Sequence, residues 1–121
     1  NRIITKTVCR HAALIANEIN ASAVCTLTHS GYTGWQISSW RPNCLVLVFT
    51  SNKRILSQLN LLWGVKCIFY NKFQSTDKTV EDVNALAIKN RYVRRGEVVV
   101  NLAAMPIKAK GQVNTLRITK L

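Results

Sequence analysis

Segment 28–33 is the part of the sequence whose residue types best suit ligand chemistry. Thr28, Ser30 and Thr33 carry hydroxyl groups, and Gly31 allows the backbone to turn tightly into a following helix. The first amide groups of a helix lack partners within the helix, and the helix dipole adds partial positive charge there. The segment therefore predicts a site for an anion such as phosphate. The alternative interpretation is that Ser30 only caps the helix and that the other hydroxyls are incidental.

A second segment, 105–113, offers positive charge to the same kind of ligand. Lys108 and Lys110 stand just before Gly111. If this segment folds over residues 28–33, two ammonium groups reach one anion, and such a charge-assisted contact is strong. The alternative is a basic surface loop without a ligand, which is common for a lysine-rich turn.

Patterns typical of catalysis and of metal binding are missing from the sequence. The two histidines, His11 and His29, have no serine and carboxylate at a spacing that suggests a triad, and Walker A and dinucleotide-binding patterns are absent. The carboxylates form no obvious catalytic pair, and the cysteines include no C-x-x-C spacing. We therefore expect no catalytic residue and no metal or other cofactor in this chain.

Helix and strand signals alternate along the chain and define the elements that must position these segments. Helical spacing predicts helices over 5–20 and 32–40, a third that Ser51 or Asn52 caps and Gly64 ends, and a fourth that ends near Gly96. The fourth helix is expected to start at Thr79, which forms a capping box with Asp82. Apolar runs predict strands over 23–28, 44–50, 65–70, 97–104 and 115–121.

This order of elements predicts an α/β fold, a three-layer sandwich whose mostly parallel five-stranded sheet has helices on both faces. The expected strand order is 3-2-1-4-5, with the last strand antiparallel to the fourth. Open sheets of this kind bind ligands beyond the carboxyl ends of the strands, where the strand order reverses. That point lies between the first and fourth strands, so topology brings segments 28–33 and 105–113 to one place.

Length and composition predict one domain over residues 1–121 with an apolar core. The chain has 121 residues, of which 48% are apolar, and no apolar run is long enough to span a membrane. Residues 1–6 include no initiator Met and no signal-peptide order, which favours a chain cut from a longer one. The cysteines, mostly in apolar runs, are expected to be free thiols in the reducing cytoplasm.

The charge of the chain is strongly positive. Seventeen Lys and Arg against five Asp and Glu give a formal net charge of +12. Nucleic acid, anionic membranes and phosphorylated small molecules all fit such a charge. The basic residues are scattered in sequence, so a solvated basic surface without a specific partner is the alternative.

Six short segments match the sequence pattern of one known family, in the same order and with the same spacing. They are 28–33 (THSGYT), 39–42 (SWRP), 50–52 (TSN), 58–65 (QLNLLWGV), 95–100 (RGEVVV) and 114–118 (NTLRI). No single segment is decisive, but six in register are specific. Over residues 5–121 the chain resembles the C-terminal domain of pyruvate kinase.

The resemblance implies one function for the whole enzyme and another for this part of it. Pyruvate kinase is a glycolytic phosphotransferase that moves phosphate from phosphoenolpyruvate to ADP, using magnesium and potassium, in a barrel domain that this chain lacks. In the family, the C-terminal domain binds phosphorylated effectors, such as a sugar phosphate or AMP, for allosteric regulation. It also makes subunit contacts in a homotetramer.

The resemblance also implies which residues would bind the effector. The family's phosphate loop aligns with Thr28, His29, Ser30, Gly31, Tyr32 and Thr33, and its effector loop, 105–113, includes Lys108, Lys110 and Gly111.

The sequence departs from fructose-bisphosphate-activated members at four positions. His29 and Tyr32 stand where those members often have Lys and Arg, while Thr79 and Leu86 stand where a Trp and an Arg hold a second phosphate. The resemblance therefore implies a pocket for one phosphate. A sugar monophosphate, AMP or no effector at all remain open.

The alternative function is a basic nucleic-acid-binding module without an allosteric role. It would require basic residues gathered on one face, with aromatic side chains among them. Arg91, Arg94 and Arg95 lie near the end of one predicted helix, and the aromatic residues stand mostly in apolar runs. We therefore expect neither nucleic acid nor a membrane as a partner.

Overall fold

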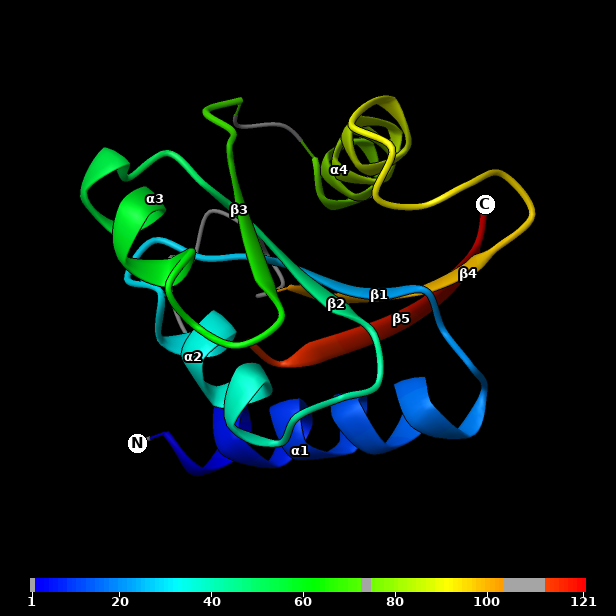
Figure 1. The fold of residues 1–121 in the computed structure, drawn as a ribbon, viewed down its shortest axis with the longest axis horizontal. Helices are drawn as coiled ribbons and strands as arrows, with labels where there is room; N and C mark the ends of the chain where they lie inside the picture. Colours follow the sequence, from blue (N-terminus) through cyan, green and yellow to red (C-terminus); the bar gives the residue numbers. More distant parts are fainter. Residues whose placement is uncertain (1, 73–74, 104–112) are drawn as a thin grey trace.

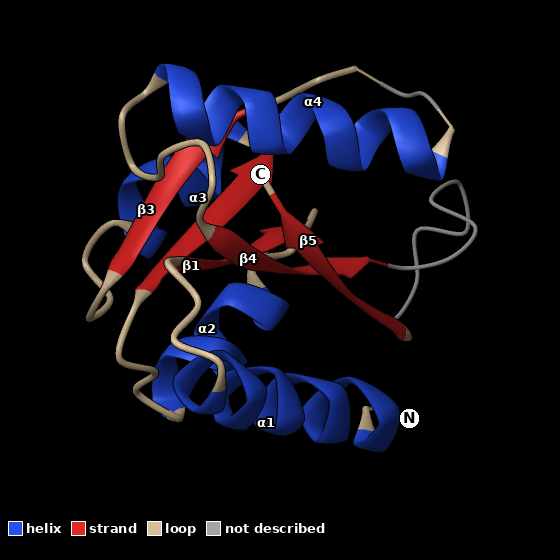
Figure 2. Cartoon of the chain, turned by 90° about the vertical axis from the view of Figure 1, so that its right-hand side faces the viewer, coloured by secondary structure: helices blue, strands red, loops and turns tan. Residues whose placement is uncertain are grey.

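A five-stranded sheet with helices on both faces forms the centre of the molecule (Figures 1 and 2). The computed structural model describes residues 2–72, 75–103 and 113–121. The elements are α1 (Ile3–Glu18), β1 (Ala23–Leu27), α2 (Tyr32–Ser39), β2 (Leu45–Thr50), α3 (Lys53–Leu59), β3 (Val65–Phe69), α4 (Thr76–Lys89), β4 (Val98–Ala103) and β5 (Thr115–Lys120).

The strand order is β3-β2-β1-β4-β5, as the sequence predicts. Neighbouring strands from β3 to β4 pair in parallel, and β5 pairs antiparallel with β4. The order reverses between β1 and β4, so these two strands meet at the predicted binding edge. The described helices are too short or too polar to cross a membrane.

Two apolar clusters fill the space on either side of the sheet. The first joins α1, α2 and α3 to one face, with Cys9, Ile37 and Leu59 among its members. The second joins α4 to the other face, with Val83 and Ala87 as its helical members. Because β1, β2 and β4 are covered on both faces, their sequences are continuous apolar runs rather than alternating ones.

Glycine allows α2 to approach the sheet closely. A Cβ atom built at Gly34 would lie 2.7 Å from Cγ2 of Val48 on β2. Any larger residue would have to push the helix away from the strand. This close approach fixes the position of α2, and with it the loop that leads into the helix.

A buried amide pair ties α4 to the sheet. Asn84 of α4 and Asn101 of β4 donate to each other at 3.4 and 2.9 Å, and the Thr119 hydroxyl of β5 donates to Asn101 at 3.0 Å. Both asparagines are nearly inaccessible to solvent. Satisfied polar groups in a core specify one packing, since any shift would leave them unpaired.

The third helix ends earlier than the sequence predicts. It stops at Leu59 and not at Gly64, because Leu62 N–H bonds back to the Leu59 carbonyl in a tight turn. The Asn60 side chain then accepts from Cys67 N–H on β3 at 2.9 Å. Asn60 therefore links the turn after α3 to the edge strand β3.

The limits of the fourth helix also differ from the prediction. Its N-cap is Ser75, whose hydroxyl accepts from Lys78 N–H, and Thr79 lies buried inside the helix. Ser75 stands one turn before the Thr79–Asp82 capping box that the sequence suggested, and serine is an equally good cap. The helix ends at Lys89 and not near Gly96, and Arg91 follows it with a φ of 64°.

Candidate functional site

Residues 28–31 connect β1 to α2 at the carboxyl edge of the sheet. Thr28 N–H continues the strand ladder by donating to the Phe49 carbonyl at 3.0 Å. Gly31 is the N-cap of α2 and has a φ of 85°, a conformation that other residues rarely adopt. An ideal Cβ at Gly31 would lie 3.4 Å from Leu59 of α3. The loop therefore needs glycine at this position, as the sequence suggests.

Two hydroxyl groups of this loop accept hydrogen bonds from its backbone. Thr28 Oγ1 accepts from Gly31 N–H at 3.1 Å, and Ser30 Oγ accepts from Tyr32 N–H at 3.3 Å. These bonds stabilise the turn, but the N-cap of α2 is Gly31 and has no side-chain cap bond, so Ser30 is not the helix cap that the alternative interpretation expects. Because a hydroxyl can accept and donate at once, each retains its own proton for a ligand.

The other predicted loop residues differ in their exposure. His29 and Ser30 are exposed, and Tyr32 is partly buried. Thr33, in the first turn of α2, is only 5% exposed, and its carbonyl faces the Cys9 thiol of α1. His29 and Ser30 are therefore the most accessible residues of the segment, and Thr28 is partly buried like Tyr32.

Asn52 joins this loop to α3, a connection that sequence reasoning missed. Its Nδ2 donates to the His29 carbonyl at 3.1 Å, and its Oδ1 accepts from Arg54 N–H at 3.1 Å as the N-cap of α3. Its own N–H donates to Thr50 Oγ1 at 3.0 Å. One side chain thus holds the loop and starts the helix that packs beneath Gly31.

Arg2 is the second residue that sequence reasoning missed. Its guanidinium carbon lies 3.7 Å from the centre of the Tyr32 ring, so a cation stands over the start of α2. Thirty positions separate the two residues in sequence, and only the packing of α1 against α2 joins them.

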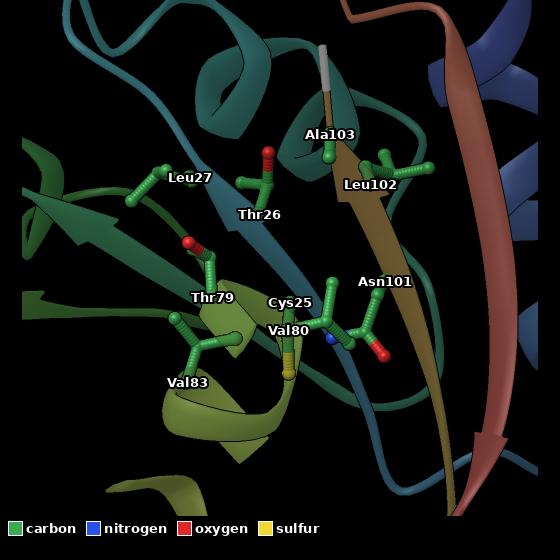
Figure 3. A pocket seen from close by; sticks show the side chains of 9 residues that line it. All are labelled: Cys25, Thr26, Leu27, Thr79, Val80, Val83, Asn101, Leu102 and Ala103. Carbon is green, nitrogen blue, oxygen red and sulfur yellow. The ribbon is translucent and has the colours of Figure 1, made fainter. Parts of the chain in front are cut away.

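A small cavity lies beside the loop, between the carboxyl ends of β1 and β4 and the start of α4 (Figure 3). Its volume is about 20 Å³, which suits one water molecule. The hydroxyls of Thr26 and Thr79, two of the residues that line it, have no hydrogen-bond partner among the described residues. The cavity in this conformation cannot hold a sugar or a nucleotide.

Metal binding has no support in the described ranges 2–72, 75–103 and 113–121. Within them, no three His, Cys, Asp or Glu side chains gather around one point. His11 lies on the exposed side of α1, with its Nδ1 atom 2.9 Å from the Thr7 carbonyl.

Comparison with known proteins identifies the family. The alpha/beta domain of pyruvate kinase matches residues 6–119. The chain belongs to the pyruvate kinase family. It corresponds to the C-terminal domain of that enzyme, as the six sequence segments imply.

Curated pyruvate kinases from three bacteria illustrate the similarity. That of Sporosarcina psychrophila is 32% identical over 95% of this chain and 20% of its own length. That of Clostridium acetobutylicum is 32% identical over 96% of this chain and 24% of its own length. Pyruvate kinase 2 of Synechocystis is 31% identical over 86% of this chain and 18% of its own length. The chain thus spans about a fifth of the length of these relatives.

Thr79 and Leu86, two of the four positions at which the resemblance implied a departure, are both described by the structure. Thr79 is buried against the cavity and Leu86 is half-buried on α4. Neither side chain carries a charge. Segment 104–112, which includes Lys108, Lys110 and Gly111, lies outside the described residues. Val113, which follows it, is buried in the cluster under α1 and α2.

Proposed function

We propose that this chain is the regulatory and oligomerisation domain of a pyruvate kinase, and that it binds a phosphorylated effector at residues 28–33. The longer enzyme would transfer phosphate from phosphoenolpyruvate to ADP in the cytoplasm. Magnesium and potassium would serve the barrel domain of that enzyme, and no metal is proposed for this chain, in whose described residues no three His, Cys, Asp or Glu side chains gather. Family membership and the free thiols of all four cysteines support this assignment.

The observation that carries effector binding is the pair of hydroxyls at the start of α2. Thr28 and Ser30 each accept one loop amide and keep a proton to donate, next to a helix N-terminus that favours negative charge. Arg2 stands over Tyr32 at the same helix end. Hydroxyls, helix dipole and guanidinium together form an environment for a phosphate group.

The surroundings favour an effector with a single phosphate. Thr79 and Leu86 carry no charge where fructose-bisphosphate-activated relatives use a Trp and an Arg. Neither residue could offer a cation to a second phosphate. The free-energy cost of removing that phosphate from water would therefore not be offset. A sugar monophosphate or AMP is therefore the proposed class, with Lys108, Lys110 and Gly111 contributing from the second loop.

Calorimetric titration with sugar monophosphates and AMP tests effector binding. Ser30→Ala should weaken binding by about 1–3 kcal/mol, or roughly 5- to 150-fold, because it removes a donor to a charged group. Ser39→Ala, at the exposed far end of α2, is the matched control and should leave affinity unchanged. Unchanged affinity in Ser30→Ala, or a large loss of melting temperature without ligand, would show that this hydroxyl is only a cap.

The oligomerisation role is proposed for the edge formed by β5. This strand ends the sheet, and Ile118 on it is 52% exposed. Ile4 and Leu14 on the neighbouring α1 are similarly exposed. An open strand edge with apolar side chains beside it is suited to pairing with another chain.

Sedimentation of the protein tests this proposal. Ile118→Lys should reduce the mass of the assembly, because a charge would be buried at the contact. Phe69→Lys on β3, the opposite edge strand, is the matched control and should leave the mass unchanged. If both variants sediment like the unmodified chain, β5 makes no subunit contact.

A further inference from the structure

The sheet has two edge strands, and the backbone of one of them already has partners within the chain. The sheet ends in β5 on one side and in β3 on the other, where α3 lies beside β3 (Figure 1). An edge strand normally presents unpaired N–H and C=O groups, which another chain can join as a further strand. At β3, the turn that precedes the strand folds over these groups.

Every second amide of β3 faces outward, away from β2. Tyr70 N–H donates to the Thr50 carbonyl of β2 at 2.8 Å, just beyond the end of the parallel ladder. Backbone groups alternate in direction along a strand, so positions 66 and 68 face β2 in the same way as Tyr70. The amides of Val65, Cys67 and Phe69 therefore face outward.

The turn between α3 and β3 occupies the first two of these outward amides. Val65 N–H donates to the Leu62 carbonyl at 3.3 Å, and Cys67 N–H donates to Asn60 Oδ1 at 2.9 Å. Asn60 directly follows α3 as its C-cap residue, seven positions before Cys67. Its side chain therefore stands where the carbonyl of an added strand would have to bind.

Positive charge lies along the same edge. The sequence has no Asp or Glu from position 19 to position 76, so α3, β3 and the segments beside them contribute only cations. The exposed ones are Lys53, Arg54, Lys66 and Lys72. The Lys53 ammonium lies 5.5 Å from the centre of the ring of Phe69, the last outward-facing residue of the strand. Charges at an edge strand, lysine above all, disfavour pairing with another copy.

We infer that Asn60 and the lysines beside it close the β3 edge against strand addition, so that sheets of different subunits can join through β5 alone. The part of this inference that concerns β5 rests on the proposed subunit contact, whereas the closure of β3 does not. If both edges accepted another chain, each added chain would leave a free edge and the assembly could grow without limit. A sheet with one closed edge keeps the assembly finite.

Hydrogen exchange at the Cys67 amide tests the closure directly. In Asn60→Ala at low protein concentration, this amide should exchange at least about tenfold faster, because it loses its acceptor. Asn60→Asp keeps an acceptor oxygen and should exchange like the unmodified protein. Asn90→Ala is the matched control, since it removes an exposed amide group that donates to the Leu86 carbonyl at the end of α4. Thermal melts establish that each variant is folded.

Sedimentation of the full-length protein under reducing conditions tests the consequence for assembly. Asn60→Ala combined with Lys66→Thr should reach a mass that rises with concentration beyond that of the unmodified protein, because the edge then has a free amide and one charge fewer. Lys66→Thr alone leaves the turn intact and should raise association less. Adding Ile118→Lys to the double variant should limit the growth, since β5 would no longer extend the assembly.

Two results would overturn the inference. The first is an exchange rate at Cys67 that Asn60→Ala leaves unchanged, since this side chain would then not protect the edge. The second is an unchanged mass for the folded double variant despite faster exchange at Cys67, since an open β3 edge would then not accept another chain. Growth that Ile118→Lys does not limit would support the closure of β3 and contradict the proposed β5 contact, so the two proposals fail separately.

Discussion

At the scale of single residues, the buried thiols show how burial alone changes chemistry. Cys9 and Cys25 are almost inaccessible to solvent, and burial raises the pKa of each thiol to about 12. The thiol of Cys9 faces the carbonyl of Thr33 at 4.0 Å, where it packs α1 against α2. These residues are parts of the core rather than nucleophiles, as their positions in the sequence suggest.

The raised pKa values predict how stability changes at high pH. A thiol in the unfolded chain ionises near pH 8.5, whereas Cys9 and Cys25 stay protonated to about pH 12 when folded. Between these limits the folded chain holds more protons, so the free energy of unfolding falls as the pH rises. Urea unfolding from pH 8 to 11 should show this fall. It should be less steep, by about one proton, in Cys9→Ala and in Cys25→Ala. An identical slope in the variants would contradict the assignment.

The residue types in segment 28–33 were predictable, but their partners were not. Glycine and hydroxyl residues between a strand and a helix form a local signal, and the structure confirms the turn at Gly31. Arg2 gave no such signal, and Asn52 was expected only as a helix cap, which the structure confirms. Their roles depend on contacts with Tyr32 and His29 across 30 and 23 positions, which only tertiary packing creates.

At the scale of elements, Asn52 couples the loop to α3. Its amide group donates to the loop and its oxygen caps the helix, so both groups depend on one side chain. Helix α3 has seven residues and little intrinsic stability, which makes its cap important. The loop geometry should therefore depend on whether α3 is formed.

Two substitutions separate the functions of Asn52. Asn52→Ala removes the cap and should lower the free energy of unfolding by about 1 kcal/mol. Asn52→Asp retains the cap oxygen but loses the donor to His29, so it should affect phosphate affinity more than stability. Denaturation and calorimetry of both variants check this. Equal stability of Asn52→Ala and the unmodified chain would mean that the cap contributes nothing.

Strands were easier to predict than helix ends, for a physical reason. The runs in β1, β2 and β4 are apolar because both faces of the sheet are covered, and burial depends little on neighbouring residues in sequence. The end of α3 depends on Asn60 bonding to β3, and the start of α4 depends on which of two good caps is used. The ends of these helices are therefore set by single side-chain hydrogen bonds.

At the scale of the whole molecule, topology determines where the predicted binding edge lies. The reversal of strand order between β1 and β4 was predictable from alternating elements and right-handed crossovers. Four of the five carboxylates lie on α4 or in the turn before β4, and this uneven charge could not be predicted, because it depends on which side of the sheet each helix covers.

The central claim, that residues 28–33 bind the phosphate of a small effector, can be tested by one measurement. Amide chemical shifts of the ¹⁵N-labelled protein would be followed during titration with AMP and with a sugar monophosphate. The account predicts saturable shifts centred on the amides of residues 28–34, at the turn and the start of α2. Shifts confined to another part of the molecule, or none in this segment at millimolar ligand, would contradict it.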